Sequence, residues 1–171
     1  QVAVNLSARQ FDGHLVELVR DVVRETGISP SALILEITEG VAMQDVDRNI
    51  VILKALHAMG LGISIDDFGT GYSSLAYLKR LPLNTLKIDQ CFIHDIATSA
   101  EDLEITRAII ALGHNLNLNV LAEGVETNEQ LQWLKSSGCD YIQGYYYCRP
   151  LPAAQLLLEL QRKNLLVGPA A

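Results

Sequence analysis

Residues 63–71 read Ile63-Ser64-Ile65-Asp66-Asp67-Phe68-Gly69-Thr70-Gly71, an apolar run followed by two adjacent acids and a glycine-rich turn. The apolar part is typical of a strand, so the pattern places Asp66 and Asp67 at the strand's carboxyl end. Neighbouring carboxylates repel each other, and a fold that presents two of them beside a bent backbone usually holds a cation. An aspartate before a turn also caps helices, and this stretch alone leaves both interpretations open.

The same arrangement recurs along the chain, where six short apolar runs each lead into a polar or ionisable residue. These residues are Asn5, Glu36, Asp66, Lys87, Glu123 and Gln143. Each interval has room for a strand, a loop, a helix and a return loop. Gly27, Gly60 and Gly138 lie just past helix-like apolar runs, where helices commonly end. The pattern predicts a βα repeat array in one domain.

Ionisable residues at the carboxyl ends of many parallel strands are typical of a (β/α) barrel, whose chemistry is drawn from several strands on that face. An open doubly wound sheet gathers its site at one switch point instead. Eight units close such a barrel, and six are counted in this sequence. We therefore predict an α/β fold, a TIM-like (β/α) barrel truncated at the N-terminus to about six βα units.

The amino-acid composition of the chain limits the classes of function that it can have. The chain has 171 residues, 49% of them hydrophobic, and a formal net charge of -7. The acidic balance argues against binding a nucleic acid polymer, which needs clustered Lys and Arg. No apolar run reaches the roughly 18 residues of a membrane span and no leader opens the chain, so we expect no membrane contact and a cytoplasmic location. Cys91, Cys139 and Cys148 lack the spacing of a zinc site or a disulfide framework.

The residues at the strand ends are hard oxygen ligands, with no histidine or cysteine among them. The candidate ligands are Asn5, Glu36, Asp66, Asp67 and Glu123. This set favours Mg²⁺ or Mn²⁺ over Zn²⁺. Five oxygen ligands suit two metals, which are the usual device for in-line displacement at phosphorus, with Asp66 as the bridge. Lys87 either positions the attacking water and neutralises phosphoryl charge, or forms a structural ion pair with Asp66 or Glu36.

With these residues placed, the chain resembles the EAL-domain family of cyclic di-GMP phosphodiesterases over essentially its whole length. Six ordered blocks carry the resemblance: Val4-Asn5-Leu6-Ser7, Leu35-Glu36-Ile37-Thr38-Glu39, Asp66-Asp67-Phe68-Gly69-Thr70-Gly71-Tyr72-Ser73-Ser74-Leu75, Leu86-Lys87-Ile88-Asp89, Ala122-Glu123-Gly124-Val125-Glu126-Thr127 and Gln143-Gly144-Tyr145. The resemblance implies a modified TIM barrel that hydrolyses cyclic di-GMP to linear 5′-pGpG with two divalent cations.

The resemblance also implies roles for individual residues. Asn5, Glu36 and Asp66 would hold the first metal, and Asp66, Asp67 and Glu123 the second. Lys87 would assist the nucleophilic water, which makes Lys87 and Glu123 the candidate catalytic residues. Glu39, Asp89, Glu126 and Gln143 would either bind the substrate or contact the residues that hold the metals. The loop of Phe68, Gly69, Thr70 and Gly71 would link a homodimer interface to the metals.

One departure from the family pattern bears on activity. The Glu-Ala-Leu motif that names the family has no match in this sequence. We therefore expect residues 1–171 to form a partial EAL domain that lacks the strands with this motif and is inactive alone. The intact domain would be a metal-dependent phosphodiesterase, with an upstream sensory or GGDEF-type domain in the parent protein. The alternative is a catalytically inactive module that binds cyclic di-GMP and signals through a partner.

Overall fold

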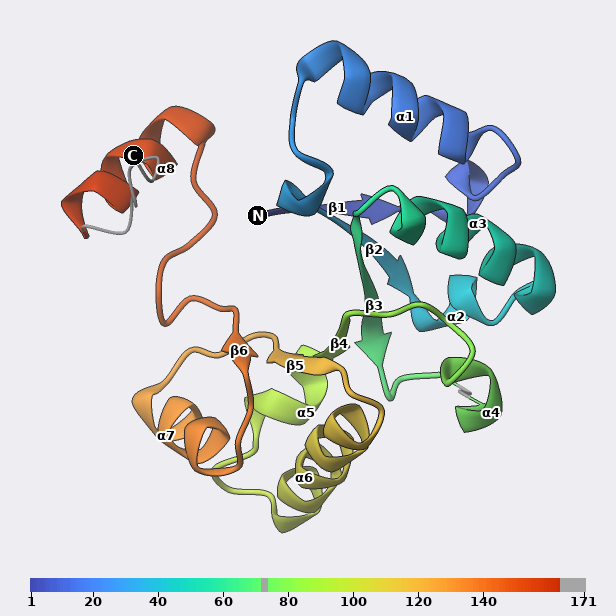
Figure 1. Ribbon diagram of the computed structural model, residues 1–171. Coiled ribbons are helices and arrows are strands. Elements are labelled where there is room, and N and C mark those ends of the chain that lie inside the picture. The colour runs from blue at the N-terminus through green and yellow to red at the C-terminus, as the bar shows by residue number, and fades with distance from the viewer. Residues whose placement is uncertain (72–73, 164–171) are drawn as a thin grey trace.

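The fold is described from a computed structural model, for residues 1–71 and 74–163. Six parallel strands form one sheet in the order of the chain. They are β1 (Val2–Leu6), β2 (Leu33–Thr38), β3 (Gly62–Phe68), β4 (Thr85–Ile88), β5 (Asn119–Ala122) and β6 (Tyr141–Ile142). The predicted α/β fold is confirmed, and Figure 1 shows the strands turning around a common axis as in a TIM-like barrel.

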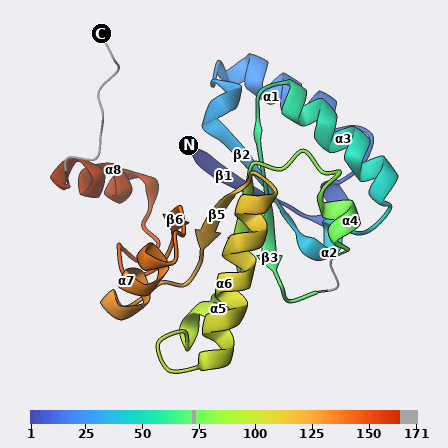
Figure 2. The ribbon, with the colours of Figure 1, turned by 60° about the horizontal axis from the view of Figure 1, so that its bottom comes forward.

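Helices lie between successive strands in the sequence and cover the outside of the sheet, except the last helix, which follows the last strand and buries none of its residues. They are α1 (Leu15–Thr26), α2 (Glu39–Ala42), α3 (Val46–Ala58), α4 (Leu75–Leu78), α5 (Gln90–His94), α6 (Ala100–Asn115), α7 (Asn128–Ser136) and α8 (Ala153–Arg162), with short 3-10 turns at Ala8–Gln10 and Pro30–Ala32. Figure 2 shows α1 beside α3, and α6 packs against β4 and β5. Gly27 ends α1 in the left-handed conformation, as its position predicts.

The hydrophobic core lies between the sheet and the helices that precede α8. Alternate strand residues such as Ile63, Ile65 and Leu86 are fully buried on the outer face of the sheet. Residues between them, such as Ser64 and Asp66, face inward. Burial of the apolar outer face drives the folding of each βα unit, and it leaves the inner face free for polar side chains.

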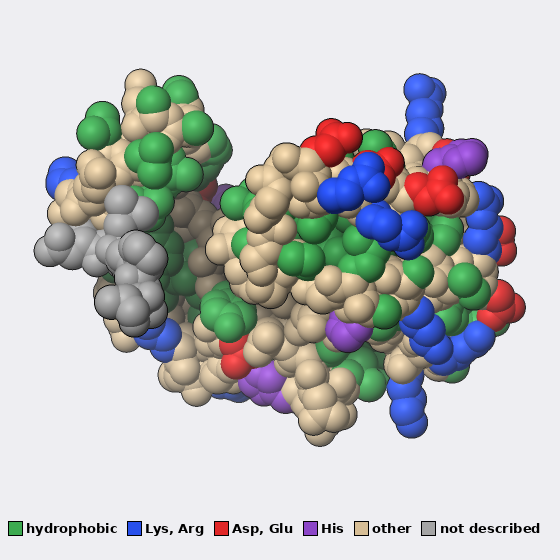
Figure 3. Space-filling view, turned by 45° about the horizontal axis from the view of Figure 1, so that its top comes forward, with side chains coloured by type: hydrophobic (Ala, Val, Ile, Leu, Met, Phe, Trp, Pro, Cys, Tyr) green, Lys and Arg blue, Asp and Glu red, His purple; other side chains and the backbone are tan. Residues whose placement is uncertain are grey.

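The sheet is open between its two end strands, β1 and β6. Its inner face borders a hollow of about 620 Å³ lined by residues of all six strands. Figure 3 shows an open notch between the α8 side of the molecule and the α1 side. Leu156, Leu157 and Leu158 of α8 are exposed beside this opening. Within the described residues, no helix is both long and apolar enough to cross a membrane.

Candidate metal centre

The carboxyl ends of four neighbouring strands bring predicted site residues into contact. Lys87 of β4 is buried, and its Nζ lies 3.0 Å from Oε1 of Glu36, 3.0 Å from Oδ1 of Asp66 and 2.7 Å from Oε1 of Glu123. Contacts of this length between an ammonium group and a carboxylate are among the strong polar interactions in proteins. Residues far apart in the sequence thus form one cluster around a single cation.

Asp67 joins this cluster because β3 contains an irregularity. The register with β4 shifts between Ile65 and Phe68, so Asp66 and Asp67 together stand opposite Lys87. Asp67 has a φ of 54°, in the left-handed region that is uncommon for residues other than glycine. A regular strand would send neighbouring side chains to opposite faces of the sheet, whereas a bulge re-aims one of them. The bulge therefore explains how two adjacent aspartates serve one site.

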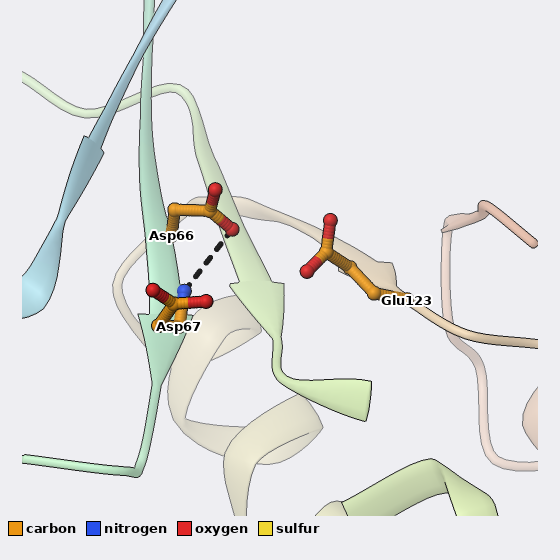
Figure 4. Close-up of side chains that lie close together, drawn as sticks. All are labelled: Asp66, Asp67 and Glu123. Atoms are coloured by element: carbon orange, nitrogen blue, oxygen red, sulfur yellow. Dashed lines mark hydrogen bonds between the residues drawn. The ribbon is translucent and has the colours of Figure 1, made fainter. Parts of the chain in front are cut away.

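Figure 4 shows the result, with Asp66 and Asp67 of β3 on one side and Glu123 beyond the end of β5 on the other. Each of these residues offers a carboxylate oxygen, and the three atoms lie within 4.8 Å of one another. The backbone N–H of Asp67 donates to Oδ1 of Asp66 over 3.0 Å, which fixes the relation between the two aspartates. The two-residue motif and a glutamate more than fifty positions away thus converge as the barrel pattern predicts.

The electrostatics of the cluster favour additional positive charge. Burial raises the pKa of Asp67, and the neighbouring charges of Asp66 and Asp89 raise it further. Burial also raises the pKa of Glu123, against the opposing effect of Lys87. Burial alone would lower the pKa of Lys87, but its carboxylate partners raise that pKa above its ordinary value. Lys87 is therefore a cation, and it neutralises only part of the cluster.

The donor set fits a hard divalent cation. Its carboxylate oxygens are the ligands that Mg²⁺ and Mn²⁺ prefer. Asn5 is the register partner of Glu36, and paired residues of neighbouring parallel strands project to the same face of the sheet. The amide of Asn5 therefore lies on the side of the sheet that carries the acids.

Glu39 lies under the loop that follows β3. It is the first residue of α2, and its Oε2 accepts a hydrogen bond from the N–H of Gly69 over 3.0 Å. A side chain at Gly69 would meet the ring of Phe92 at 2.9 Å, and one at Gly71 would meet Oε1 of Glu39 at 3.0 Å. The absence of a side chain at Gly69 and Gly71 thus allows the loop to pack closely against Phe92 and Glu39. Residues 72 and 73 of the motif lie outside the described residues.

A pocket of about 350 Å³ opens beside the cluster. It is lined by Asp67 and Glu123 together with Asp89, Glu126 and Gln143. Asp89 caps α5, because its carboxylate accepts the N–H of Cys91 over 2.7 Å. Burial opposes ionisation of Asp89, but this bond and others lower its pKa. The pocket therefore brings the predicted outer residues of the site next to the carboxylates.

Sequence reasoning did not identify two residues that support the site. Phe92 packs beneath Gly69, and no pattern in the sequence marks this tertiary contact. Gln130 lies near the start of α7, where it forms a capping box with Thr127. The spacing of Thr127 and Gln130 is the signature of a capping box, so this part of the role of Gln130 is visible in the sequence.

Comparison with known proteins identifies close relatives. The family profile described as the EAL domain matches residues 1–150. The chain is 55% identical over 160 residues to MucR of Pseudomonas aeruginosa, described as a bifunctional diguanylate cyclase/cyclic di-GMP phosphodiesterase. It is 49% identical over 157 residues to NbdA of the same organism, described as a cyclic di-GMP phosphodiesterase. The matches cover 93% and 91% of the chain but 23% and 20% of the relatives, so the chain spans less than a quarter of their length.

Solved structures of other proteins resemble this chain in both fold and sequence. The MucR phosphodiesterase in its complex with cyclic di-GMP has a TM-score of 0.88 and 55% sequence identity, over 91% of the chain and 64% of that protein chain. BlrP1 of Klebsiella pneumoniae, in a complex with manganese and cyclic di-GMP, has a TM-score of 0.81 and 34% identity, over 88% of the chain and 39% of that protein chain. A divalent metal is thus present in the structure of a relative at this level of identity.

Proposed function

This chain belongs to the EAL domain family, and from that membership we propose that it carries most of the active site of a phosphodiesterase that hydrolyses cyclic di-GMP to linear 5′-pGpG. One observation carries the proposal. The carboxylates of Asp66, Asp67 and Glu123 converge within 4.8 Å, and Lys87 contacts two of these residues. This arrangement matches the chemistry of metal-assisted hydrolysis at phosphorus.

The proposed ligand sets follow from the strand ends. Asn5, Glu36 and Asp66 would hold the first cation, and Asp66, Asp67 and Glu123 would hold the second, with Mg²⁺ or Mn²⁺ as the metal. Cations bound there supply a more acidic water and positive charge for the phosphoryl oxygens. Asp66 would be the shared ligand, and its hydrogen bond from the Asp67 N–H keeps its carboxylate in one orientation.

A count of charges supports two cations over one. Four carboxylates (Glu36, Asp66, Asp67 and Glu123) and the ammonium of Lys87 leave three negative charges. One divalent cation leaves the cluster at one negative charge, which repels a phosphodiester. Two bring these five side chains to one positive charge, before the nearby acids Asp89 and Glu126 are counted, so both cations are needed to offset the cluster for a negatively charged phosphodiester. The donor set is thus suited to an anionic substrate once both cations are bound.

Lys87 lies among the carboxylates of the cluster. Its buried Nζ has three carboxylate neighbours, so its position is fixed before substrate arrives. We assign Lys87 to orient the attacking water and to offset the charge that develops on the phosphoryl oxygens. Glu123 is assigned as a metal ligand that also takes part in the chemistry through its contact with Lys87.

The outer residues complete the proposal. Glu39 holds the loop of Phe68, Gly69, Thr70 and Gly71 through the Gly69 N–H. Asp89, Glu126 and Gln143 line the pocket beside the carboxylates and are assigned to the substrate or to the metal ligands. The wider context is proposed from the relatives: a bacterial signalling protein acting in the cytoplasm as a homodimer, with a GGDEF-type or sensory domain in the same polypeptide. MucR is described as having both cyclase and phosphodiesterase functions.

We also propose that residues 1–171 are one part of a longer EAL domain. The chain corresponds to 64% of the MucR phosphodiesterase chain and to 72% of the EAL domain of Mycobacterium smegmatis DcpA. The remaining part of such a domain would supply the Glu-Ala-Leu motif and the strands that close the sheet between β6 and β1.

Hydrolysis of cyclic di-GMP by the intact domain tests the proposal. We expect turnover with Mg²⁺ or Mn²⁺, none in chelator, and inhibition by Ca²⁺, whose larger and looser coordination shell misplaces the water. Asp66→Ala should abolish calorimetric metal binding, and Lys87→Ala should impair turnover more than binding. Asp47→Ala, at an exposed position on α3, is the matched control. Full activity in chelator would rule out the metal mechanism, and tight nucleotide binding without turnover would favour the receptor alternative.

A further inference from the structure

Gln130 is a buried amide with a complete set of partners. Its Oε1 accepts from the N–H groups of Glu126 and Thr127, at 2.7 and 2.9 Å. Its Nε2 donates to the carbonyls of Ile93 and His94, both at 3.1 Å. A side-chain amide has two donor hydrogens and one acceptor oxygen with two lone pairs, so these four bonds use its full capacity. Such a side chain holds both of its partners in place.

The partners belong to two loops that carry site residues. Ile93 and His94 end α5, which follows Lys87 and the pocket residue Asp89. Glu126 and Thr127 belong to the segment that follows Glu123 after β5. Gln130 therefore joins the end of one loop of the site to the other through side-chain hydrogen bonds that span 36 or 37 positions in the sequence.

The same two loops touch directly at a second point. Gly124 has a φ of 68°, and a Cβ placed there would lie 2.6 Å from Cβ of Gln90. The segment is also held from the side of β6, because the N–H of Val125 donates to the carbonyl of Gln143 over 3.0 Å. Glu123 is therefore on a short segment whose spacing from α5 is set by Gln90, Gly124 and Gln130.

We propose that Gln130 is a positioning residue for the metal centre, which sets the distance between the Glu123 carboxylate and the Asp66–Asp67 pair by tying the segment after β5 to α5. The inference rests on the proposed function, since it assigns Gln130 to the metal ligands of that site. Metal ligands must be held within fractions of an ångström, and the groups that hold them commonly change metal affinity by about 10- to 100-fold when removed.

A purely local role for Gln130 makes a different prediction. Its capping box with Thr127 needs an acceptor at this position of the helix, and glutamate serves there as well as glutamine. An ionised glutamate, however, cannot donate to the carbonyls of Ile93 and His94, and its charge would face two carbonyl oxygens, while a protonated one could donate to only one of them. Gln130→Glu thus retains the cap and replaces the tie to α5 by repulsion from the same two carbonyl groups.

The decisive measurement is Mn²⁺ binding by calorimetry to the full chain, with circular dichroism as the check of folding. We expect Gln130→Glu to bind Mn²⁺ at least about 10-fold more weakly than wild type. Gln132→Glu introduces the same charge on the exposed face of α7 and should bind like wild type. A folded Gln130→Glu variant whose Mn²⁺ affinity is within twofold of wild type overturns the proposal.

A second variant covers the case in which Gln130→Glu does not fold. Gln130→Met has a similar length, buries no charge and removes all four hydrogen bonds. It should also lose Mn²⁺ affinity, and wild-type affinity in this variant overturns the proposal. Asp67→Asn separates this inference from the proposed function. Equal, weak binding by wild type and Asp67→Asn would overturn the metal site itself, whereas a defect in Asp67→Asn alone leaves the site intact and overturns the role of Gln130.

Discussion

The ammonium of Lys87 lies 2.7 Å from the carboxylate of Glu123, on the inner face of the sheet. Other carboxylates on this face also contact the ammonium. Glu36 and Asp66 are its further partners, each at 3.0 Å. In the protein without metal, this one cation offsets the charge of three buried or half-buried acids. The stability of the site therefore depends on Lys87 most strongly when divalent cations are absent.

We predict that Lys87→Met lowers the free energy of unfolding by about 3 kcal/mol in chelator, because it leaves the carboxylates without their common partner. Mg²⁺ should restore part of the loss, since it binds the same oxygens. The pKa of Lys87 is raised, so its contribution is present below its ordinary pKa and is lost only as pH rises through the raised value. Urea unfolding at neutral pH, with and without Mg²⁺, measures the effect.

Lys54→Met is the control for this experiment, because Lys54 is exposed on α3 and forms no ion pair within the described residues. It should change the unfolding free energy by less than about 0.5 kcal/mol in either condition. A Lys87→Met chain as stable as wild type in chelator would show that the acids protonate or rearrange without cost, contrary to the ion-pair account.

The sequence predicts the strand ends and their chemistry well, because polar side chains after apolar runs are a local signal. Glu123, for example, directly follows β5, as the pattern predicts. β3 runs over Gly62–Phe68, so Asp66 and Asp67 lie at its carboxyl end as predicted. The bulge at Asp67 depends on the pairing of β3 with β4, which no local pattern contains. The partners of Gln130 likewise lie on a distant element, so only its cap could be predicted.

The stability of Asp67→Asn relative to wild type should depend on pH. The pKa of Asp67 is raised in the folded protein, so its ionised form costs stability at high pH, and this cost disappears as pH falls through the raised value. In chelator, Asp67→Asn should therefore be more stable than wild type at pH 8, with the difference shrinking toward zero at acidic pH. Mg²⁺ should reverse the order at pH 8, because wild type then gains a ligand. Unfolding curves across this range test both signs.

Gly69→Ala should destabilise the loop after β3. Gly69 has a φ of 98°, and an added Cβ would meet Phe92 at 2.9 Å, so the variant combines backbone strain with a clash. We expect a loss of about 2 kcal/mol, together with weaker metal binding because the loop follows Asp67 directly. Gly13→Ala, where the structure leaves open space around an added Cβ, should be neutral. Equal thermal unfolding of the two variants would contradict this account of the loop.

The last prediction concerns the chain by itself. β1 and β6 are the end strands of the sheet, Val2 and Val4 of β1 are exposed, and α8 presents Leu157 and Leu158 to solvent. Open strand edges and apolar faces favour association between copies. We expect the 171-residue chain to self-associate and to show negligible turnover of cyclic di-GMP.

A chimera that adds the N-terminal part of the MucR phosphodiesterase domain should be monodisperse and active, since the two sequences are 55% identical over the matched part. Light scattering and a hydrolysis assay on both proteins decide the question. A monodisperse and fully active 171-residue chain would show that the six units form a complete enzyme.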